Sequence, residues 1–194
     1  MAALLQQDWN VLREGIDDLE RFLLAPELYW QLTRGRTGPH GNVQFSLGTL
    51  ELSIARLSAV AWPAEQMAEL DDLLTKVQTV RKQWQVNWAR KAEREYSARL
   101  RLWQDALLEV LSDQRGRAGG YAFEARWRSM LELLESNAGS QPKAVEREAL
   151  SMLDSRLRAV TRPGPFLWEP EVELAFPART FWYLYVTFPE HSSH

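Results

Sequence analysis

Cysteine is absent from this 194-residue chain, and histidine occurs only three times, as His40, His191 and His194. The lack of cysteine excludes disulfide bonds, thiol catalysis and thiolate metal sites, and it fits a reducing compartment. The histidines stand at no helical spacing with carboxylate ligands, and no Gly-x-Ser-x-Gly or phosphate-loop motif is found. The sequence therefore predicts no catalytic residue, no cofactor and no metal.

Long apolar runs are also missing. The densest apolar stretch covers residues 181–186, which is far short of the roughly 18 residues that indicate a membrane span. The first residues do not place a basic region before an apolar core, so no secretory signal is predicted. A net charge of −3 gives no general attraction for nucleic acid or for an anionic membrane. We therefore expect a cytoplasmic protein that does not associate with membranes.

Glycine and proline are absent between Pro63 and Gly116, where apolar residues recur at steps of three, four and seven. These steps keep side chains on one face of an α-helix and predict a single helix over 64–114. At 1.5 Å per residue that helix would be roughly 75 Å long. The stripe consists of Leu70, Leu74, Val77, Trp84, Trp88, Ala92, Tyr96, Leu100, Trp103, Leu107 and Val110.

Shorter helices are expected on both sides of the long one, over 8–24, 46–60, 121–137 and 142–160. Asp8 is the candidate N-cap of the first, and Gly139 is expected to end the third. Residues 43–58 also alternate around Gly48, so a hairpin is the alternative there, although the apolar spacing favours a helix.

From Arg162 onward the chain has a different character, because five of the nine prolines are interleaved there with eight aromatic residues. Prolines at this density prevent a long helix, and the rings are too many to leave in water. We expect residues 161–190 to form an extended arm that docks onto a helical body over 8–160. The candidate docking residues are Phe166, Trp168, Phe176, Phe181 and Trp182.

These patterns together predict a single all-α domain over 1–194. Its expected architecture is an antiparallel helical bundle around the 64–114 helix, closed by the aromatic, proline-rich C-terminal arm. At 194 residues the chain is long enough for one well-packed core, and a second independent core is not expected.

Several charged residues fall on predicted apolar faces and define a candidate polar cluster. Its members are Glu95, Arg99, Glu124, Arg128 and Arg156. Because an unpaired buried charge is costly, each must find a partner, water or a ligand. One interpretation is a pocket in which arginines receive an anionic ligand or a partner's carboxylate. The favoured interpretation is internal ion pairing at i, i+4, together with side chains that reach past the apolar face to solvent.

Residues 81–101 carry a net charge of +5, from seven basic and two acidic residues. With Trp84 and Trp88 nearby, this face could bind nucleic acid through phosphate contacts and stacking. A solvated helix face is the favoured interpretation, because both tryptophans lie on the stripe that the helix must bury.

Over residues 80–188 the chain resembles an uncharacterised group of bacterial helical proteins with no assigned function. The resemblance rests on the Trp-x-x-x-Trp motif, the run YAFEARWRSMLELL, and the later FLWEP and FP-x-x-x-x-WYLY segments. It implies a helical fold and carries over no catalytic residue.

The leading expectation for function is a non-enzymatic interaction or assembly module that engages a protein partner or another copy of itself. A long helix exposes much side surface, and a stripe that exceeds its intramolecular cover tends to be covered by another chain. The alternative is a ligand-binding or enzymatic bundle that uses the polar cluster. Nucleic-acid binding through 81–101 is the third.

Overall fold

The structure, a computed structural model, describes residues 3–32, 44–112 and 117–189 and is mainly helical. Its long helices are α1 (Ala3–Leu24), α2 (Leu47–Ala59), α3 (Ala64–Gln83), α4 (Gln85–Ser112), α5 (Arg117–Ser136) and α6 (Ala144–Val160). Short elements are β1 (Trp30–Gln31), β2 (Gln44–Phe45), β3 (Arg162–Pro163), β4 (Val186–Thr187) and the 3₁₀ helices η2 (Pro170–Ala175) and η3 (Trp182–Leu184). The predicted all-α fold with a C-terminal aromatic segment is confirmed.

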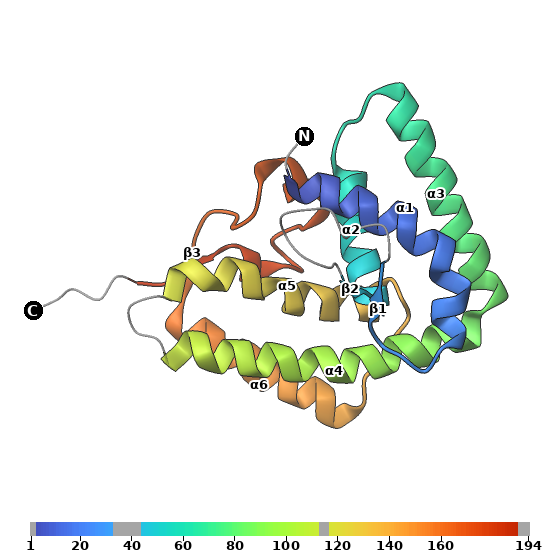
Figure 1. Ribbon diagram of the computed structural model, residues 1–194. Coiled ribbons are helices and arrows are strands. Elements are labelled where there is room, and N and C mark those ends of the chain that lie inside the picture. The colour runs from blue at the N-terminus through green and yellow to red at the C-terminus, as the bar shows by residue number, and fades with distance from the viewer. Residues whose placement is uncertain (1–2, 33–43, 113–116, 190–194) are drawn as a thin grey trace, which may run out of the picture.

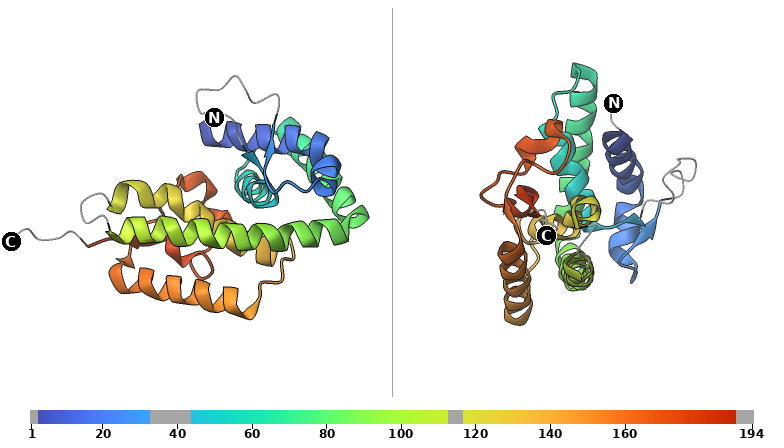
Figure 2. Two further views of the ribbon diagram at one scale, coloured as in Figure 1. Left: turned by 60° about the horizontal axis from the view of Figure 1, so that its bottom comes forward. Right: turned by 90° about the vertical axis from the view of Figure 1, so that its left-hand side faces the viewer.

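Helix α4 is the axis of the molecule. It runs antiparallel to α5 and lies between α5 and α6 in the left view of Figure 2, while α1 and α2 cover the half nearer its N-terminus. The arrangement follows from the stripe, since its members from Trp88 to Val110 are all buried against these neighbours.

The single helix expected over 64–114 is divided at Trp84 into α3 and α4. Trp84 leaves helical geometry at φ −115° and ψ 33°, yet its N–H still bonds to the carbonyl of Val80, and its carbonyl still accepts from Trp88. The chain therefore turns sharply without a loop (Figure 1). The turn lets α3 pack on α1, where Arg13 forms a bidentate pair with Glu69 at 2.6 and 2.7 Å, so both parts of the stripe find cover within one chain.

Residues 47–59 are helical, so the helix expected in this region is confirmed and the hairpin alternative is wrong. Ser46 caps α2, because its side-chain oxygen accepts from the N–H of Thr49 at 3.2 Å. The preceding strand β2 pairs with β1, placing Trp30 opposite Phe45. Helix α1 begins at Ala3 rather than at Asp8, so Asp8 is a buried residue inside the helix and not its cap.

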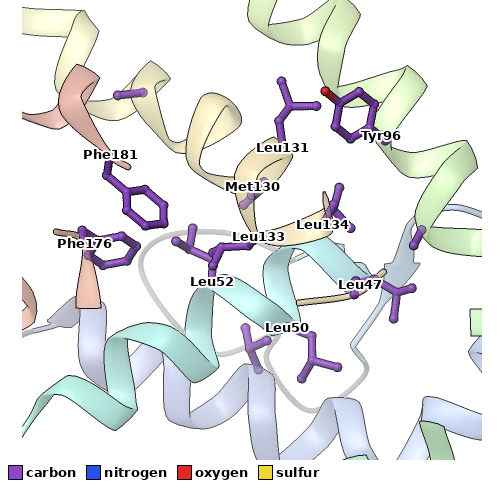
Figure 3. Close-up of a cluster of buried hydrophobic side chains, with 14 of the residues drawn as sticks. Leu47, Leu50, Leu52, Tyr96, Met130, Leu131, Leu133, Leu134, Phe176 and Phe181 are labelled. Atoms are coloured by element: carbon purple, nitrogen blue, oxygen red, sulfur yellow. The ribbon is translucent and has the colours of Figure 1, made fainter. Parts of the chain in front are cut away.

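A shared core joins α2, α4, α5 and the C-terminal segment. Figure 3 shows Leu47, Leu52, Met130 and Phe176 among the side chains that converge there from three of these elements. Gly139, at φ +75°, ends α5 in the left-handed conformation that glycine tolerates, as predicted. Ser140 then donates its N–H to the carbonyl of Leu134, which closes the helix terminus.

The aromatic arm lies against the helical body. Phe176 and Phe181 are buried, and Phe166, Trp168 and Trp182 are half-buried against the same core. Strands β3 and β4 pair Arg162 with Thr187 and so hold the two ends of the arm together. No helix among the described residues is long and apolar enough to cross a membrane.

Candidate functional site

A cavity of about 750 Å³ opens between α1, α2, α5 and residues 167–169 of the arm, with the buried Arg99 of α4 at its base. This volume is within the range of small-molecule sites in proteins. Three arginines, two carboxylates and three aromatic rings contribute to the lining, namely Arg56, Arg99, Arg126, Asp8, Glu169, Phe123, Trp127 and Trp168.

Arg99 is buried and has a fixed position. Its Nε donates to Glu95 Oε1 at 3.1 Å and its Nη2 donates to the hydroxyl of Ser46 at 3.0 Å. The same Glu95 oxygen accepts the N–H of Gly48 in the first turn of α2, where a carboxylate is favourable. A Cβ on Gly48 would lie 2.7 Å from this oxygen, so only glycine fits there. Arg99 and Glu95 thus lock α4 to the start of α2.

Arg56 and Asp8 form the second charged pair, and it is incomplete. Arg56 Nη1 lies 3.7 Å from Asp8 Oδ1, while Ser53 donates to that oxygen at 2.8 Å. Asp8 Oδ2 and Arg56 Nε are buried without a hydrogen-bond partner in the described part of the chain. Burial raises the pKa of the Asp8 carboxyl, although Arg56 opposes the change, and burial lowers the pKa of Arg56. Both pKa shifts arise because burial in the pocket wall disfavours the charged form of each side chain.

Arg126 is the third cation, and it forms no hydrogen bond or ion pair with any residue among those described. Its guanidinium lies 3.3 Å from the ring centre of Phe123 and 4.1 Å from that of Trp127. Burial, opposed by Glu124, and the neighbouring cations Arg99 and Arg56 lower the pKa of Arg126 to about 10. Glu124 partly offsets the charge of Arg126 without forming an ion pair with it, so this end of the pocket holds a cation that has no ion-pair partner among the described residues.

The structure brings together only part of the predicted polar cluster. Glu95 and Arg99 meet at the base of the pocket, as described above. Glu124 is half-buried and accepts from the indole N–H of Trp127 at 2.7 Å instead of pairing with Arg128. Arg156 was expected near the centre of an apolar face but is exposed, because α6 buries Leu153 and Leu157 and turns Arg156 to solvent.

Arg128 belongs to a separate cluster on the opposite side of α5. Its guanidinium pairs with Asp154 of α6 through two bonds of 3.1 Å and with Glu132 through a third. The ring of Tyr183 lies 4.6 Å from it. Three of the five N–H groups of Arg128 are thus bound to two carboxylates, and the cluster joins α5, α6 and η3.

Sequence reasoning missed four of the five charged residues that line the pocket, namely Asp8, Arg56, Arg126 and Glu169. Asp8 was interpreted as a cap, and Arg56 lies in the segment where helix and hairpin competed. Arg126 was not selected, although it lies three residues after Phe123 and four before Met130 and therefore on the apolar face expected for its helix. The run Arg126-Trp127-Arg128 was a signal, because two cations flanking a half-buried ring must face different surroundings.

The basic face over 81–101 is smaller than its composition indicates. Trp88, Lys91 and Arg99 are buried. The Lys91 ammonium donates to the carbonyl of Phe22 in the last turn of α1 and to the carbonyls of Ala25 and Glu27 just beyond it. These groups are therefore engaged within the fold and do not reach a nucleic acid.

No three His, Cys, Asp or Glu side chains converge as metal ligands within 3–32, 44–112 and 117–189; all three histidines lie outside these ranges. The chain matches no protein-family model, no curated protein and no solved structure among those to which it was compared. A function for the pocket must therefore be argued from its own chemistry.

Proposed function

We propose that the protein binds a small organic anion in the pocket between α1, α2, α5 and residues 167–169. Arg126 carries the proposal: it lines the cavity beside two further arginines and has no carboxylate partner within the described structure. An anion placed there would accept charge-assisted hydrogen bonds and offset the repulsion from Arg99 and Arg56. Arg99 and Arg56 act as supports, because each already faces a protein carboxylate.

Thermal unfolding of the full chain in acetate, benzoate or inorganic phosphate tests this function. A ligand at one hundred times its Kd stabilises the folded state by about 2.7 kcal/mol. For a chain of this size that shift raises Tm by several degrees. We expect at least one of these anions to raise Tm of the wild type, and Arg126→Gln to abolish the increase.

The matched control is Arg158→Gln. Arg158 also rests on an aromatic ring, 3.4 Å from the centre of Trp182, but it does not line this pocket. The control variant should retain the full anion response. An equal response in Arg126→Gln and wild type, or no response to any of the anions, would contradict the proposal.

A second candidate, self-association through α6, is supported by a different observation. Val145 and Met152, seven residues apart and so on one face of α6, are 66% and 55% exposed, and two large apolar side chains of this face therefore meet solvent. In a symmetric dimer such a face meets its own copy. This candidate retains the interaction module expected from the sequence, with a second copy of the chain as partner.

Light scattering decides this candidate. Met152→Glu should convert a dimer to monomers, whereas Leu174→Glu, at an 87% exposed apolar residue in η2, should leave the dimer intact. A wild type that scatters as a 22.5 kDa monomer at micromolar concentration would rule it out. For either function we propose a cytoplasmic location, which the lack of cysteine supports.

A further inference from the structure

The faces of the pocket arginines are covered by aromatic rings. Arg56 lies 4.7 Å from the centre of Trp168, Arg99 packs on Tyr29 and Trp127, and Arg126 packs on Phe123 and Trp127. A guanidinium whose faces are covered presents only its N–H edges. Those edges match the two oxygens of a planar carboxylate in a bidentate arrangement.

The charges that line the pocket favour a ligand with one negative charge. Asp8 faces Arg56 and Glu95 faces Arg99. Glu124 acts on the charge of Arg126 but accepts from the indole of Trp127 and forms no ion pair with it, so Arg126 is the cation with which a ligand can pair. Glu169, exposed at the pocket, adds a further negative charge close enough to Asp8 and Arg56 to affect both. A dianion would satisfy Arg126 with one charge and meet these carboxylates with the other, so its binding is disfavoured.

The pocket also offers a surface for a flat ring. Phe123 is 59% exposed, which is unusual for a large aromatic side chain, and it lines the cavity beside the half-buried Trp127 and Trp168. Leu52 and Met130 add buried apolar surface deeper in the wall. An aromatic ring gains both apolar burial and edge-to-face or offset contacts on such a surface.

We infer that the ligand is an aromatic monocarboxylate, with its carboxylate at the edge of Arg126 and its ring against Phe123 and Trp168. This inference rests on the proposed anion-binding function and adds the chemical class of the ligand. Arg126 selects the carboxylate, Asp8 and Glu169 exclude dianions such as phosphate esters, and the rings favour an aromatic body over an aliphatic one.

Calorimetric titration of the full chain with 3-phenylpropionate, propionate, phenyl phosphate and inorganic phosphate tests the inference. At pH 8 the phosphate ester is a dianion, because its second pKa is about 6. We expect 3-phenylpropionate to bind at least about tenfold more tightly than propionate, a ratio that one buried ring readily supplies. Phenyl phosphate should bind about tenfold more weakly than 3-phenylpropionate.

Two variants separate the contributions. Phe123→Leu removes the ring contact of the ligand and also the aromatic cover on Arg126, so it should weaken the binding of 3-phenylpropionate more than that of propionate. Glu169→Gln should increase the affinity for phenyl phosphate by about threefold and change the affinity for 3-phenylpropionate by less, because a dianion gains more from the loss of a negative charge. Both residues are exposed or partly exposed, so neither change threatens the fold.

The outcomes distinguish the inference from the function on which it rests. If phenyl phosphate or propionate binds as tightly as 3-phenylpropionate, the assigned ligand class is wrong, while the proposed anion binding stands. If none of the four compounds binds the wild type, the proposed function itself fails. A Phe123→Leu variant that binds 3-phenylpropionate like the wild type overturns the placement of the ring.

Discussion

Arg126 and Arg128 lie two residues apart on α5, and their surroundings differ in one decisive respect. Arg128 is buried with two carboxylates that bind it through three hydrogen bonds. Arg126 faces a cavity and has no acid partner in the described chain. The comparison shows that an arginine on α5 can either hold helices together or stay open to a ligand. The presence or absence of carboxylate partners decides between the two roles. We call these surroundings the paired side and the open side of α5.

The largest effect is expected on the paired side. Arg128→Met would leave Asp154 and Glu132 without their cation in a mostly buried setting, and breaking such a pair costs roughly 3–5 kcal/mol of unfolding free energy. Urea unfolding measures this loss. The control Arg156→Ala removes an exposed arginine of α6 and should cost under about 1 kcal/mol. Equal losses in the two variants would erase the distinction between a fixed and a solvated arginine.

Glu51 of α2 gives the matching case of an acidic residue. It is buried, and its neighbours do not fully offset the cost of its negative charge. Burial raises its pKa to about 7, although the charge of Arg81 and a hydrogen bond from Asn137 oppose the change. The folded state therefore holds a proton that the unfolded state releases between pH 4.5 and about 7, and stability falls as pH rises through this window.

Glu51→Gln removes this penalty. Stability at pH 8 should increase by about 1–3 kcal/mol, whereas the gain at pH 4 should be close to zero. Denaturation at the two pH values measures both numbers. If Glu51→Gln raises the free energy of unfolding equally at both pH values, ionisation of Glu51 does not destabilise the protein and the prediction is wrong.

Gly48→Ala tests how rigidly the base of the open side is held. The new Cβ would lie 2.7 Å from Glu95 Oε1 and 3.3 Å from Met130, so the buried Glu95–Arg99 pair must shift. Overpacking of this kind costs roughly 1–3 kcal/mol. Gly120→Ala is the control, because a Cβ there meets nothing within 4 Å and should stabilise α5 by about 0.5–1 kcal/mol. If Gly48→Ala is also neutral or stabilising, the pair at the base is mobile.

The smallest effect on stability is expected for Arg126→Gln. With no acid partner to lose, the variant should unfold within about 1 kcal/mol of the wild type. The same substitution should abolish the anion response described above. If Arg126→Gln destabilises the protein as much as Arg128→Met does, Arg126 has a structural role and the contrast between the paired side and the open side disappears.

The fold was largely readable because periodicity records burial. Trp88, Tyr96 and Trp103 lie on one helical face and are buried as expected. The turn at Trp84 was not readable, because the residues around it contain no glycine or proline and the two flanking backbone bonds are kept. The cause is tertiary: α3 packs on α1, which a local pattern does not record.

The site was readable only where a charge interrupts the stripe. Glu95 and Arg99 interrupt it and were identified, and the structure places both at the base of the pocket. Arg56, Arg126 and Asp8 come from three other helical faces, and their meeting depends on how α1, α2 and α5 cross. The prediction for Arg156 was wrong for a simpler reason. The buried face of α6 was assigned with the wrong rotation about the helix axis, so a residue expected in the core is exposed to solvent.

The contact between Glu95 and Gly48 has a consequence for amide exchange. The N–H of Gly48 lies in the first turn of α2, where no helical carbonyl is available to accept it, and its acceptor is a carboxylate on α4. Its deuteration rate therefore reports whether α4 remains docked rather than whether α2 remains helical. Slow exchange at this single amide would register the assembled base of the pocket, and faster exchange would reveal a transient separation of the two helices before either one unwinds.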